Sequence, residues 1–456
     1  MLNAVENKDD LNTKRALIAE LLASEVFPAS PAQQGLWIAS QMERDHSLYN
    51  IPVGLRLRGP LRAEILERSL QAVVDRHGAL RTTFELKDDQ IVQRRSRHAH
   101  CSMDYVDLSG CSDGEVMAEA HVQTVAAISK PMDLSRGPLF SSTLLKLRET
   151  DHILICNMHH IISDAWSAGI LVRELTDNYL RLSTNPSYVR EPLELQYSDF
   201  TIWLRDYYQT DTVRSQVEYW KKKLKGSPPL LNLPSDRSRG AEKQGRGARQ
   251  TIRLQPSLIG ELKAIAARNQ VTFFVLMLAA FKVFLYRYSG QADILVGVPV
   301  AGRNQIETES MIGLFVNTIV LRSDLSGNPK FGILLQQVQD TTIQALANQD
   351  VSFDRLVEEL QPVRSFSYNP LFQVMFTTFK AAVSSSIIGD LEIAPHPINT
   401  GTSRFDLNAA LIEGTNDWWF QLEYSTSLFD DTTISNMLAN FRTLLCSVAG
   451  IEPSQA

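Results

Sequence analysis

The stretch ILICNMHHIISDAWSAGIL, residues 153–171, joins an apolar run to two adjacent histidines, an aspartate and a segment with helical spacing. A short apolar run bounded by polar residues is typical of a buried strand. Apolar residues then recur about every four positions from Trp166 to Leu180, as they do on one face of a helix. The stretch therefore predicts a strand, a loop that carries polar side chains, and a helix.

The two histidines cannot both face the same side if the strand persists to its end. Side chains in a strand point alternately to its two faces, so His159 and His160 are expected to point in opposite directions. One ring can then line a cavity while the other is held in the interior by hydrogen bonds. The pair is therefore interpreted as one working residue and one scaffold residue.

Three kinds of chemistry compete for this cluster. A metal site from His159, His160 and Asp164 is disfavoured, because divergent histidines are poor co-ligands and no further His or Cys follows at ligand spacing. A serine nucleophile at Ser167 is also disfavoured, because the segment AWSAG has Ala165 where a nucleophile elbow needs glycine. The favoured interpretation is a histidine that acts as base or hydrogen-bonding anchor in acyl transfer, with Asp164 held by an arginine elsewhere.

Composition narrows the class of protein. With 456 residues the chain exceeds one typical core, which predicts two lobes. Its net charge of −6 is too small to favour nucleic acid as a partner. Four scattered cysteines without a C-x-x-C pair, and acids where a signal peptide needs an apolar core, favour a cytoplasmic protein. Lys282 and Arg287 interrupt the apolar segment 271–290, which is expected to be a buried helix rather than a membrane span.

Both halves of the chain alternate helical and strand patterns, which predicts a mixed α/β fold. Helices are expected at 14–22, 61–76, 166–180, 256–269, 271–288 and 432–445, and strands at 80–86, 139–147, 151–160, 292–302, 313–325 and 418–429. The Pro-, Gly- and Arg-rich segment 226–250 is expected to be a linker or surface loop. Asp430 or Asp431 is placed to cap the last helix.

The pattern H-H-x-x-x-D followed by a small residue, Trp and Ser resembles the active-site motif of condensation domains in nonribosomal peptide synthetases. These domains belong to a wider acyltransferase superfamily that includes chloramphenicol acetyltransferase. The resemblance spans nearly the whole chain, in family order, through SPAQQGLWIASQ (30–41), YNIP (49–52), RHGALRTTF (76–84), YSDFTIW (197–203), VGVPVAGR (296–303), IGLFVNT (312–318), NQDVSFD (348–354), NPLFQVMF (369–376) and SRFDL (403–407).

The resemblance implies an α/β fold with mixed sheets, in which two chloramphenicol-acetyltransferase-like lobes form a V-shaped pseudo-dimer with a central tunnel. It implies a linker helix within 1–24, an N-terminal lobe at 25–185 and a C-terminal lobe at 186–456. The implied reaction joins a donor acyl or peptidyl thioester to the amine of an acceptor aminoacyl thioester. The domain itself would bind no cofactor. Donor and acceptor carrier proteins would supply the phosphopantetheine arms, with acyl-CoA as donor in a starter domain.

The resemblance also assigns roles to individual residues. His160 is the catalytic histidine in the tunnel, and His159 and Asp164 are structural, with Arg303 as the expected salt-bridge partner of Asp164. Ser167, Trp203 and Asn317 are candidates for the tunnel lining, although packing roles compete for Trp203 and Asn317. No metal is implied. Adjacent synthetase domains are expected partners, and the excised domain is expected to be a monomer.

Ala165 departs from the family pattern, which has glycine at this position. If the position needs a positive φ, the methyl group costs about 1 kcal/mol or more. A catalytically degenerate domain kept for binding carriers therefore stays open as an alternative. Among active types, elongation and starter domains are both compatible, and a free-standing or ester-forming acyltransferase also remains open. The chain contains no carrier serine motif of the G-G-x-S kind, so a domain of a larger synthetase is expected.

Overall fold

The computed structural model describes residues 26–42, 47–241, 245–363, 365–380, 385–415 and 417–452, so the expected helix at 14–22 lies outside the described residues. The chain forms two compact units. Unit 1 comprises Met1–Thr210, Arg303–Phe315 and Val383–Ile398, and unit 2 comprises Asp211–Gly302, Val316–Ala382 and Asn399–Ala456. The first unit thus continues past the boundary expected at residue 185, because α6 (Tyr197–Tyr207) packs against β1 and the turn η1.

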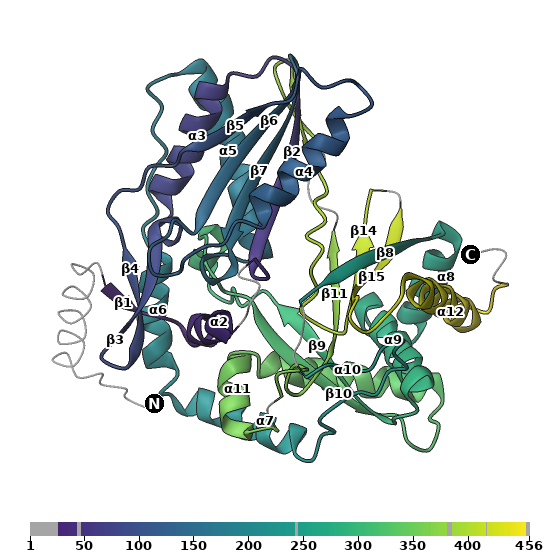
Figure 1. The fold of residues 1–456 in the computed structure, drawn as a ribbon. Coiled ribbons are helices and arrows are strands. Elements are labelled where there is room, and N and C mark those ends of the chain that lie inside the picture. Colours follow the sequence, from purple (N-terminus) through teal and green to yellow (C-terminus); the bar gives the residue numbers. More distant parts are fainter. Residues whose placement is uncertain are drawn as a thin grey trace. The chain divides into compact units, whose positions relative to one another are not determined.

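Unit 1 is built on a six-stranded mixed sheet in the order β12-β13-β2-β7-β6-β5 (Figure 1). Its strands are β2 (Asn50–Arg58), β5 (Met103–Asp107), β6 (Phe140–Arg148), β7 (Asp151–His159), β12 (Ser386–Ile388) and β13 (Leu391–Pro395). The pairing is antiparallel except between β5 and β6. A three-stranded sheet combines β1 (Val26–Pro28), β4 (Gln90–Arg95) and β3 (Thr82–Lys87). The central place of β7 fixes the position where the histidine motif begins.

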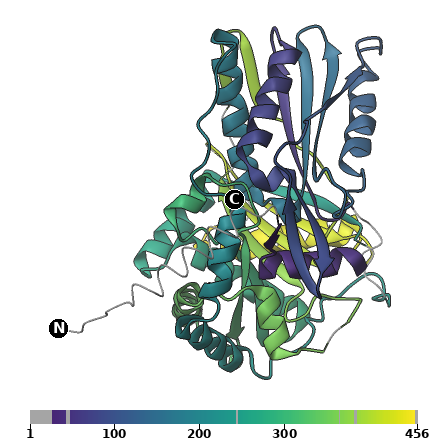
Figure 2. The ribbon, with the colours of Figure 1, turned by 90° about the vertical axis from the view of Figure 1, so that its left-hand side faces the viewer.

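Helices cover both faces of the larger sheet in unit 1, with the pair α3 and α5 on one face and α4 on the other (Figures 1 and 2). The helices of this unit are α2 (Pro31–Met42), α3 (Ala63–Arg76), α4 (Val116–Ile128), α5 (Ala165–Thr184) and α6, with the 3₁₀ turns η1 (Gly78–Arg81), η2 (His160–Ile162) and η3 (Ile306–Ser310). Ile153 and Ile155 of β7 pack in the core beside α4. Because both faces are covered, β7 is buried from His152 to His159, as its apolar run predicts.

Unit 2 has its own six-stranded mixed sheet in the order β10-β9-β11-β14-β15-β8. The strands are β8 (Gly247–Leu254), β9 (Asp293–Val300), β10 (Asn317–Asp324), β11 (Val374–Lys380), β14 (Leu407–Glu413) and β15 (Trp418–Ser425), and the helices are α7 (Asp211–Leu224), α8 (Pro256–Arg268), α9 (Phe273–Ser289), α10 (Phe331–Ala347), α11 (Phe353–Leu360) and α12 (Asp431–Ala449). Strand β11 runs parallel to its neighbours, β14 and β9, and the other pairs are antiparallel. Phe281 of α9 contacts the rings of Phe376, Phe420 and Phe441, which joins helix and sheet in one core.

Two details of unit 2 correct the sequence-based expectations. The expected linker at 226–250 overlaps β8, which begins at Gly247 and pairs with β15. Its alternation is hard to recognise because β8 is an edge strand that carries charged side chains, a common protection of sheet edges. Asp430 is the N-cap residue of α12, but its side chain makes no capping bond and pairs with Arg237 instead.

The apolar helix expected at 271–288 is a core helix of unit 2. Residues 275–282 of α9 are all buried, and the amine of Lys282 donates to Leu321 O and Ser323 Oγ, both at 2.7 Å. In the part of the chain that the structure describes, no single helix has the length and apolarity to span a membrane. The helices α8 and α9 meet those criteria when taken together, and the chain bends by 104° between them.

Candidate functional site

The histidine motif begins where β7 ends. His159 is the last residue of the strand, and His160 opens the single 3₁₀ turn η2, so the strand ends one residue earlier than expected. The turn forms because Nδ1 of His159 accepts a hydrogen bond from Ile161 N at 3.1 Å, which satisfies an N–H at the start of the turn. The side chain of His159 is 2% exposed, whereas His160 is half-buried. The expected division into one interior and one accessible histidine is therefore confirmed, but a turn produces it rather than strand alternation.

His159 is a neutral scaffold residue. Because Nδ1 accepts the N–H of Ile161, the ring proton lies on Nε2. Burial, with a smaller effect of the neighbouring His160, lowers the pKa of His159 to about 3. A charged His159 would have no place in this interior, so the residue serves the fold and cannot serve as a base near neutral pH.

Burial of His159 predicts a loss of stability on acidification. Its pKa is about 3 in the folded chain and about 6.5 in the unfolded chain, so between these values the unfolded chain binds a proton that the folded chain excludes. Stability is therefore full above pH ~6.5 and falls as the pH is lowered, by up to about 1.4 kcal/mol per pH unit for each such group. Burial also lowers the pKa of His77 and His152, which act in the same direction.

Urea denaturation at several pH values between 5 and 7.5 would measure this slope. A His159→Gln variant is expected to reduce it by about one proton's worth. A His98→Gln variant is the control, since His98 is exposed in the folded chain and its loss should leave the slope unchanged. An equal slope in the His159→Gln variant and the wild type would contradict the assignment of His159 as a buried neutral residue.

The ring of His160 is held by its own turn. Nδ1 lies 2.7 Å from the carbonyl oxygen of Ser163. A carbonyl can only accept, so Nδ1 carries the proton and Nε2 is the basic nitrogen of the neutral ring. The backbone is fixed as well, because His160 N donates to Tyr49 O at 2.8 Å and Ser163 N donates to His160 O at 3.2 Å. A half-buried imidazole with a fixed tautomer can take a proton from a bound nucleophile.

Asp164 is a buried structural carboxylate. It is the N-cap of α5, with Oδ1 accepting from Ser167 N at 2.7 Å and Oδ2 accepting from Phe315 N at 3.0 Å. Its ion pair with Arg303, at 3.2 Å, confirms the partner expected from the sequence, and the two side chains are 2% and 1% exposed. Asp164 therefore ties the start of α5 to the segment 303–315.

Arg303 folds that segment onto unit 1. Its Nη1 donates to the carbonyl oxygens of Thr308 and Met311, the latter at 2.8 Å, and its Nη2 donates to Ser167 Oγ at 3.0 Å. The guanidinium also lies 4.0 Å from the ring centre of Phe315. Burial lowers the pKa of Arg303, and the charge of Asp164 acts against that shift. The buried cation is thus held by carbonyls, a hydroxyl, a carboxylate and an aromatic face.

Ser167 and Ala165 occupy very different positions in the first turn of α5. Ser167 is fully buried, and its Oγ donates to Gly313 O at 2.9 Å and accepts from Gly313 N at 3.1 Å. These bonds describe a packing residue. Ala165 is the first residue of the helix, is exposed, and is not among the residues with positive φ in the described chain. The conformational cost considered for an alanine at this position therefore does not arise.

The remaining candidates lie apart from this network. Trp203 of α6 is 44% exposed and stacks on Tyr207, with ring centres 4.9 Å apart. Asn317 belongs to unit 2. Its amide donates to Gln349 O at 2.8 Å and Val351 O at 2.7 Å and accepts from Phe353 N at 3.0 Å, so it holds the loop before α11.

Two residues that support the site were not singled out from the sequence. Tyr197 donates its hydroxyl to Leu314 O at 2.7 Å, and His77 accepts at Nδ1 from Ile312 N at 3.3 Å. Both hold the segment 303–315 from positions far away in the sequence. Both lie in stretches that carry the family resemblance, RHGALRTTF and YSDFTIW, which was the only available signal.

The described residues contain no group of three or more His, Cys, Asp or Glu side chains that could hold a metal ion. The four cysteines are free thiols, and burial raises the pKa of Cys101 to about 11. The chemistry at the motif is therefore assigned to protein groups and the substrates.

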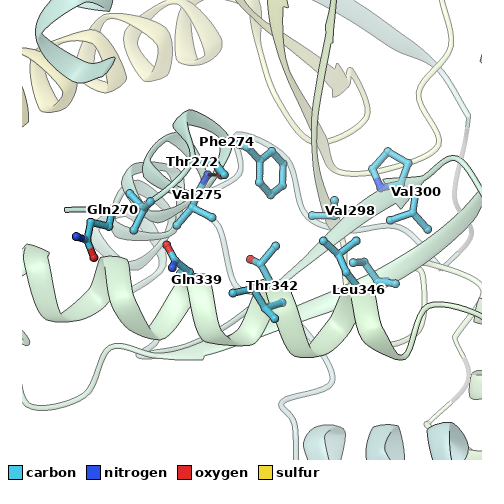
Figure 3. Close-up of a pocket in the computed structure, with 13 residues that line it drawn as sticks. Gln270, Thr272, Phe274, Val275, Val298, Val300, Gln339, Thr342 and Leu346 are labelled. Atoms are coloured by element: carbon cyan, nitrogen blue, oxygen red, sulfur yellow. Dashed lines mark hydrogen bonds between the residues drawn. The ribbon is translucent and has the colours of Figure 1, made fainter. Parts of the chain in front are cut away.

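Unit 2 contains an apolar cavity of about 550 Å³. It lies between the start of α9, the end of β9, β10 and α10 (Figure 3). Aliphatic side chains such as Val275, Val298 and Leu346 form most of its wall, while Gln270 and Gln339 stand together at one end. Such a space accepts an alkyl or aromatic group.

Comparison with known proteins places this architecture. The sequence model of the condensation domain matches residues 23–455. One of the linear gramicidin synthase proteins of Brevibacillus parabrevis is 39% identical over 441 residues, which cover 96% of this chain and 9% of that protein. Surfactin synthase subunit 1 of Bacillus subtilis (strain 168) is 35% identical over 440 residues, covering 96% and 12%. The chain therefore spans roughly a tenth of the length of these relatives.

Solved structures share the fold over almost the whole chain. The X-domain in its complex with OxyB from teicoplanin biosynthesis has a TM-score of 0.85 at 26% identity, with 94% of each chain covered. The starter condensation domain of rhizomide synthetase, in complex with C8-CoA and Leu-SNAC, has a TM-score of 0.81 at 22% identity, covering 94% of this chain and 95% of that chain. The second likeness concerns the fold alone.

Proposed function

Because this chain belongs to the condensation-domain family of nonribosomal peptide synthetases, acyltransferases that form amide bonds, we propose that it joins a donor acyl or peptidyl group to an acceptor aminoacyl thioester. Both groups would reach the domain on the phosphopantetheine arms of carrier proteins. The acceptor amine attacks the thioester carbonyl carbon of the donor, the C–N bond forms and the C–S bond breaks. The nitrogen loses a proton, and the departing donor thiolate gains one.

The observation that carries this proposal is the fixed tautomer of His160. With the proton on Nδ1 held by Ser163 O at 2.7 Å, Nε2 is the basic nitrogen that can accept a proton or a hydrogen bond from the attacking amine. A thioester is already activated, so most of the barrier lies in orienting the amine and handling its proton. A single held imidazole is sufficient for both tasks.

The groups around His160 support it without entering the reaction. Asp164 and Arg303 are buried as a pair, and His159 is buried and neutral. They fix the end of β7 and the start of α5, between which His160 lies. Mispositioning of a reacting group by about 1 Å can cost a hundredfold in rate, so this rigidity is part of the proposed catalysis.

Ala165 is expected to be a neutral departure from the family's glycine. An Ala165→Gly variant should keep its turnover within about threefold and lose no more than about 1 kcal/mol of stability, since glycine is the poorer helix residue. Turnover and urea denaturation of the variant and the wild type would measure both. A large gain in turnover on restoring glycine would mean that the methyl group obstructs the site.

The type of donor belongs to the same proposal. An elongation domain takes an aminoacyl or peptidyl group from a donor carrier, and a starter domain takes a fatty acyl group from coenzyme A or a carrier. The apolar cavity of unit 2 supports an apolar group on one substrate, although it suits a fatty chain and an apolar amino-acid side chain equally. An ester-forming reaction would follow the same course with a hydroxyl acceptor.

The test is turnover with matched donors, followed by mass spectrometry of the acceptor carrier. An aminoacyl-loaded acceptor carrier is combined with octanoyl-CoA or with an aminoacyl-loaded donor carrier. Product from octanoyl-CoA assigns a starter domain, and product from the donor carrier alone assigns an elongation domain. If every donor fails while both carriers still bind, the chain is a carrier-binding module and the proposed reaction is wrong.

A further inference from the structure

A second cavity lies within unit 1, away from the histidine motif along the chain. It measures about 390 Å³ and is lined by residues of α6, of the preceding loop and of the segment 305–311: Leu195, Asp199, Phe200, Ile202, Trp203, Asp206, Gln305, Glu307, Thr308 and Met311. Its lining is therefore both aromatic and acidic. The proposed acyl transfer makes no use of it.

The charge of this lining is one-sided. Three carboxylates, on Asp199, Asp206 and Glu307, belong to it, and no lysine or arginine occurs among the described residues that line it. Asp206 has a long contact of 3.8 Å to Arg205, and these two side chains are 70% and 50% exposed, so the contact is a weak surface pair. An incoming cation could replace Arg205 at little cost.

One carboxylate of the lining is incompletely satisfied. Oδ2 of Asp199 accepts from Gln196 N at 2.8 Å, as part of the capping box that starts α6. Its Oδ1 is buried and has no hydrogen-bond partner among the described residues. A buried carboxylate oxygen without a donor is costly and indicates that a donor comes from elsewhere, or that the nearby negative charge awaits a cation.

The surroundings of the cavity are apolar and uncovered by the described chain. Leu195, Trp203 and Ile306 are 46%, 44% and 78% exposed. Large exposed apolar side chains that gather beside charged ones mark interaction sites. Trp203 also presents an aromatic face beside the carboxylates, and aromatic faces attract guanidinium and ammonium groups.

The wall of the cavity is rigid because it belongs to the segment that Arg303 holds. The carbonyl oxygens of Thr308 and Met311, two lining residues, accept from Arg303 Nη1. The opposite wall is α6, where Phe200 and Trp203 stack at 5.7 Å and Trp203 and Tyr207 at 4.9 Å between ring centres. A preformed wall of this kind lowers the entropic cost of binding.

We propose that this cavity docks a basic segment of a partner protein, with an arginine or lysine among the carboxylates and flanking apolar side chains on Leu195, Trp203 and Ile306. Charge complementarity selects the cation, and the exposed apolar rim selects a peptide over a small free ion. The proposal does not depend on the acyl-transfer reaction, since none of these residues holds His160.

The test uses two labelled ten-residue peptides that share the same leucines and carry either four arginines or four glutamates. Fluorescence anisotropy with the full chain is expected to give binding of the arginine peptide at least about tenfold tighter than the glutamate peptide. The double variant Asp206→Asn/Glu307→Gln should weaken the arginine peptide about tenfold. The matched variant Asp113→Asn/Glu149→Gln removes two carboxylates that are 96% and 87% exposed, also in unit 1, and should stay within about twofold of the wild type.

Three results would overturn the proposal. The first is equal binding by the wild type and the Asp206→Asn/Glu307→Gln variant. The second is an equal loss in the matched variant, which would reveal attraction to net charge alone. The third is binding of arginine amide as tight as that of the peptide, which would make the cavity a site for small cations. An Ile306→Ser variant, altered at an exposed side chain, is expected to weaken the peptide while leaving arginine amide unaffected.

Discussion

Replacing His160 by alanine is expected to lower the rate of amide formation by about 10²–10⁴-fold, the usual contribution of a positioned proton-transfer group. The loss follows from removing Nε2, the basic nitrogen that the bond from Nδ1 to Ser163 O leaves as proton acceptor. Stability should change little, because His160 is half-buried and lies in a turn whose backbone bonds remain. Single-turnover rates and urea denaturation of the same preparations would measure the two effects separately.

A His160→Asn variant separates the two roles of this ring. The side-chain amide of asparagine can still donate to Ser163 O, as Nδ1 does, but it offers no basic nitrogen. If the histidine acts as a base, the asparagine variant should be as slow as the alanine variant. If the asparagine variant keeps more than about a tenth of the wild-type rate, His160 mainly positions the amine and the assignment of a base is wrong.

Replacing Arg303 by alanine is expected to destabilise unit 1 by about 3–5 kcal/mol, the cost of breaking a buried ion pair from one side. The side chains of Arg303 and Asp164 are 1% and 2% exposed, so the substitution leaves a buried carboxylate without this cation. It also removes the donor to Thr308 O and Met311 O, which orders the segment 303–315. Urea denaturation followed by far-ultraviolet circular dichroism would report the loss.

The control for this prediction is an exposed ion pair. Arg214 and Asp211 lie 2.6 Å apart with side chains 69% and 97% exposed, so an Arg214→Ala variant should change stability by less than about 1 kcal/mol. Similar losses in the two variants would mean that burial of the Arg303–Asp164 pair has no special weight. A loss below about 1 kcal/mol for Arg303→Ala would contradict the structural role given to this pair.

The local structure around the motif was predictable because it follows from patterns a few residues long. The apolar run to Met158 is a central strand, Leu66, Leu70 and Val73 lie buried on one face of α3, and α5 begins directly after Asp164. The end of the strand was not predictable. It depends on the bond from Ile161 N to His159 Nδ1, which alternation of side chains does not encode.

The long-range part of the site could not be obtained from pattern alone. Residues 303–315 belong to unit 1 although unit 2 precedes and follows them in the chain. Their place depends on Arg303, Tyr197 and His77, and the last two bond to this segment across more than a hundred residues. Only the family resemblance suggested Arg303 as the partner of Asp164, and it could not show the cavity wall that this segment forms.

The most direct test of the proposed acyl transfer is intact-mass analysis of the acceptor carrier after a single turnover, for the wild type and the His160→Ala variant side by side. The account predicts that the wild type increases the mass of the aminoacyl-loaded acceptor by that of the donor acyl group, and that the variant yields about 10²–10⁴-fold less at the same time point. Equal mass gain with both proteins, or none with the wild type on any carrier-bound or CoA-bound donor, would contradict it.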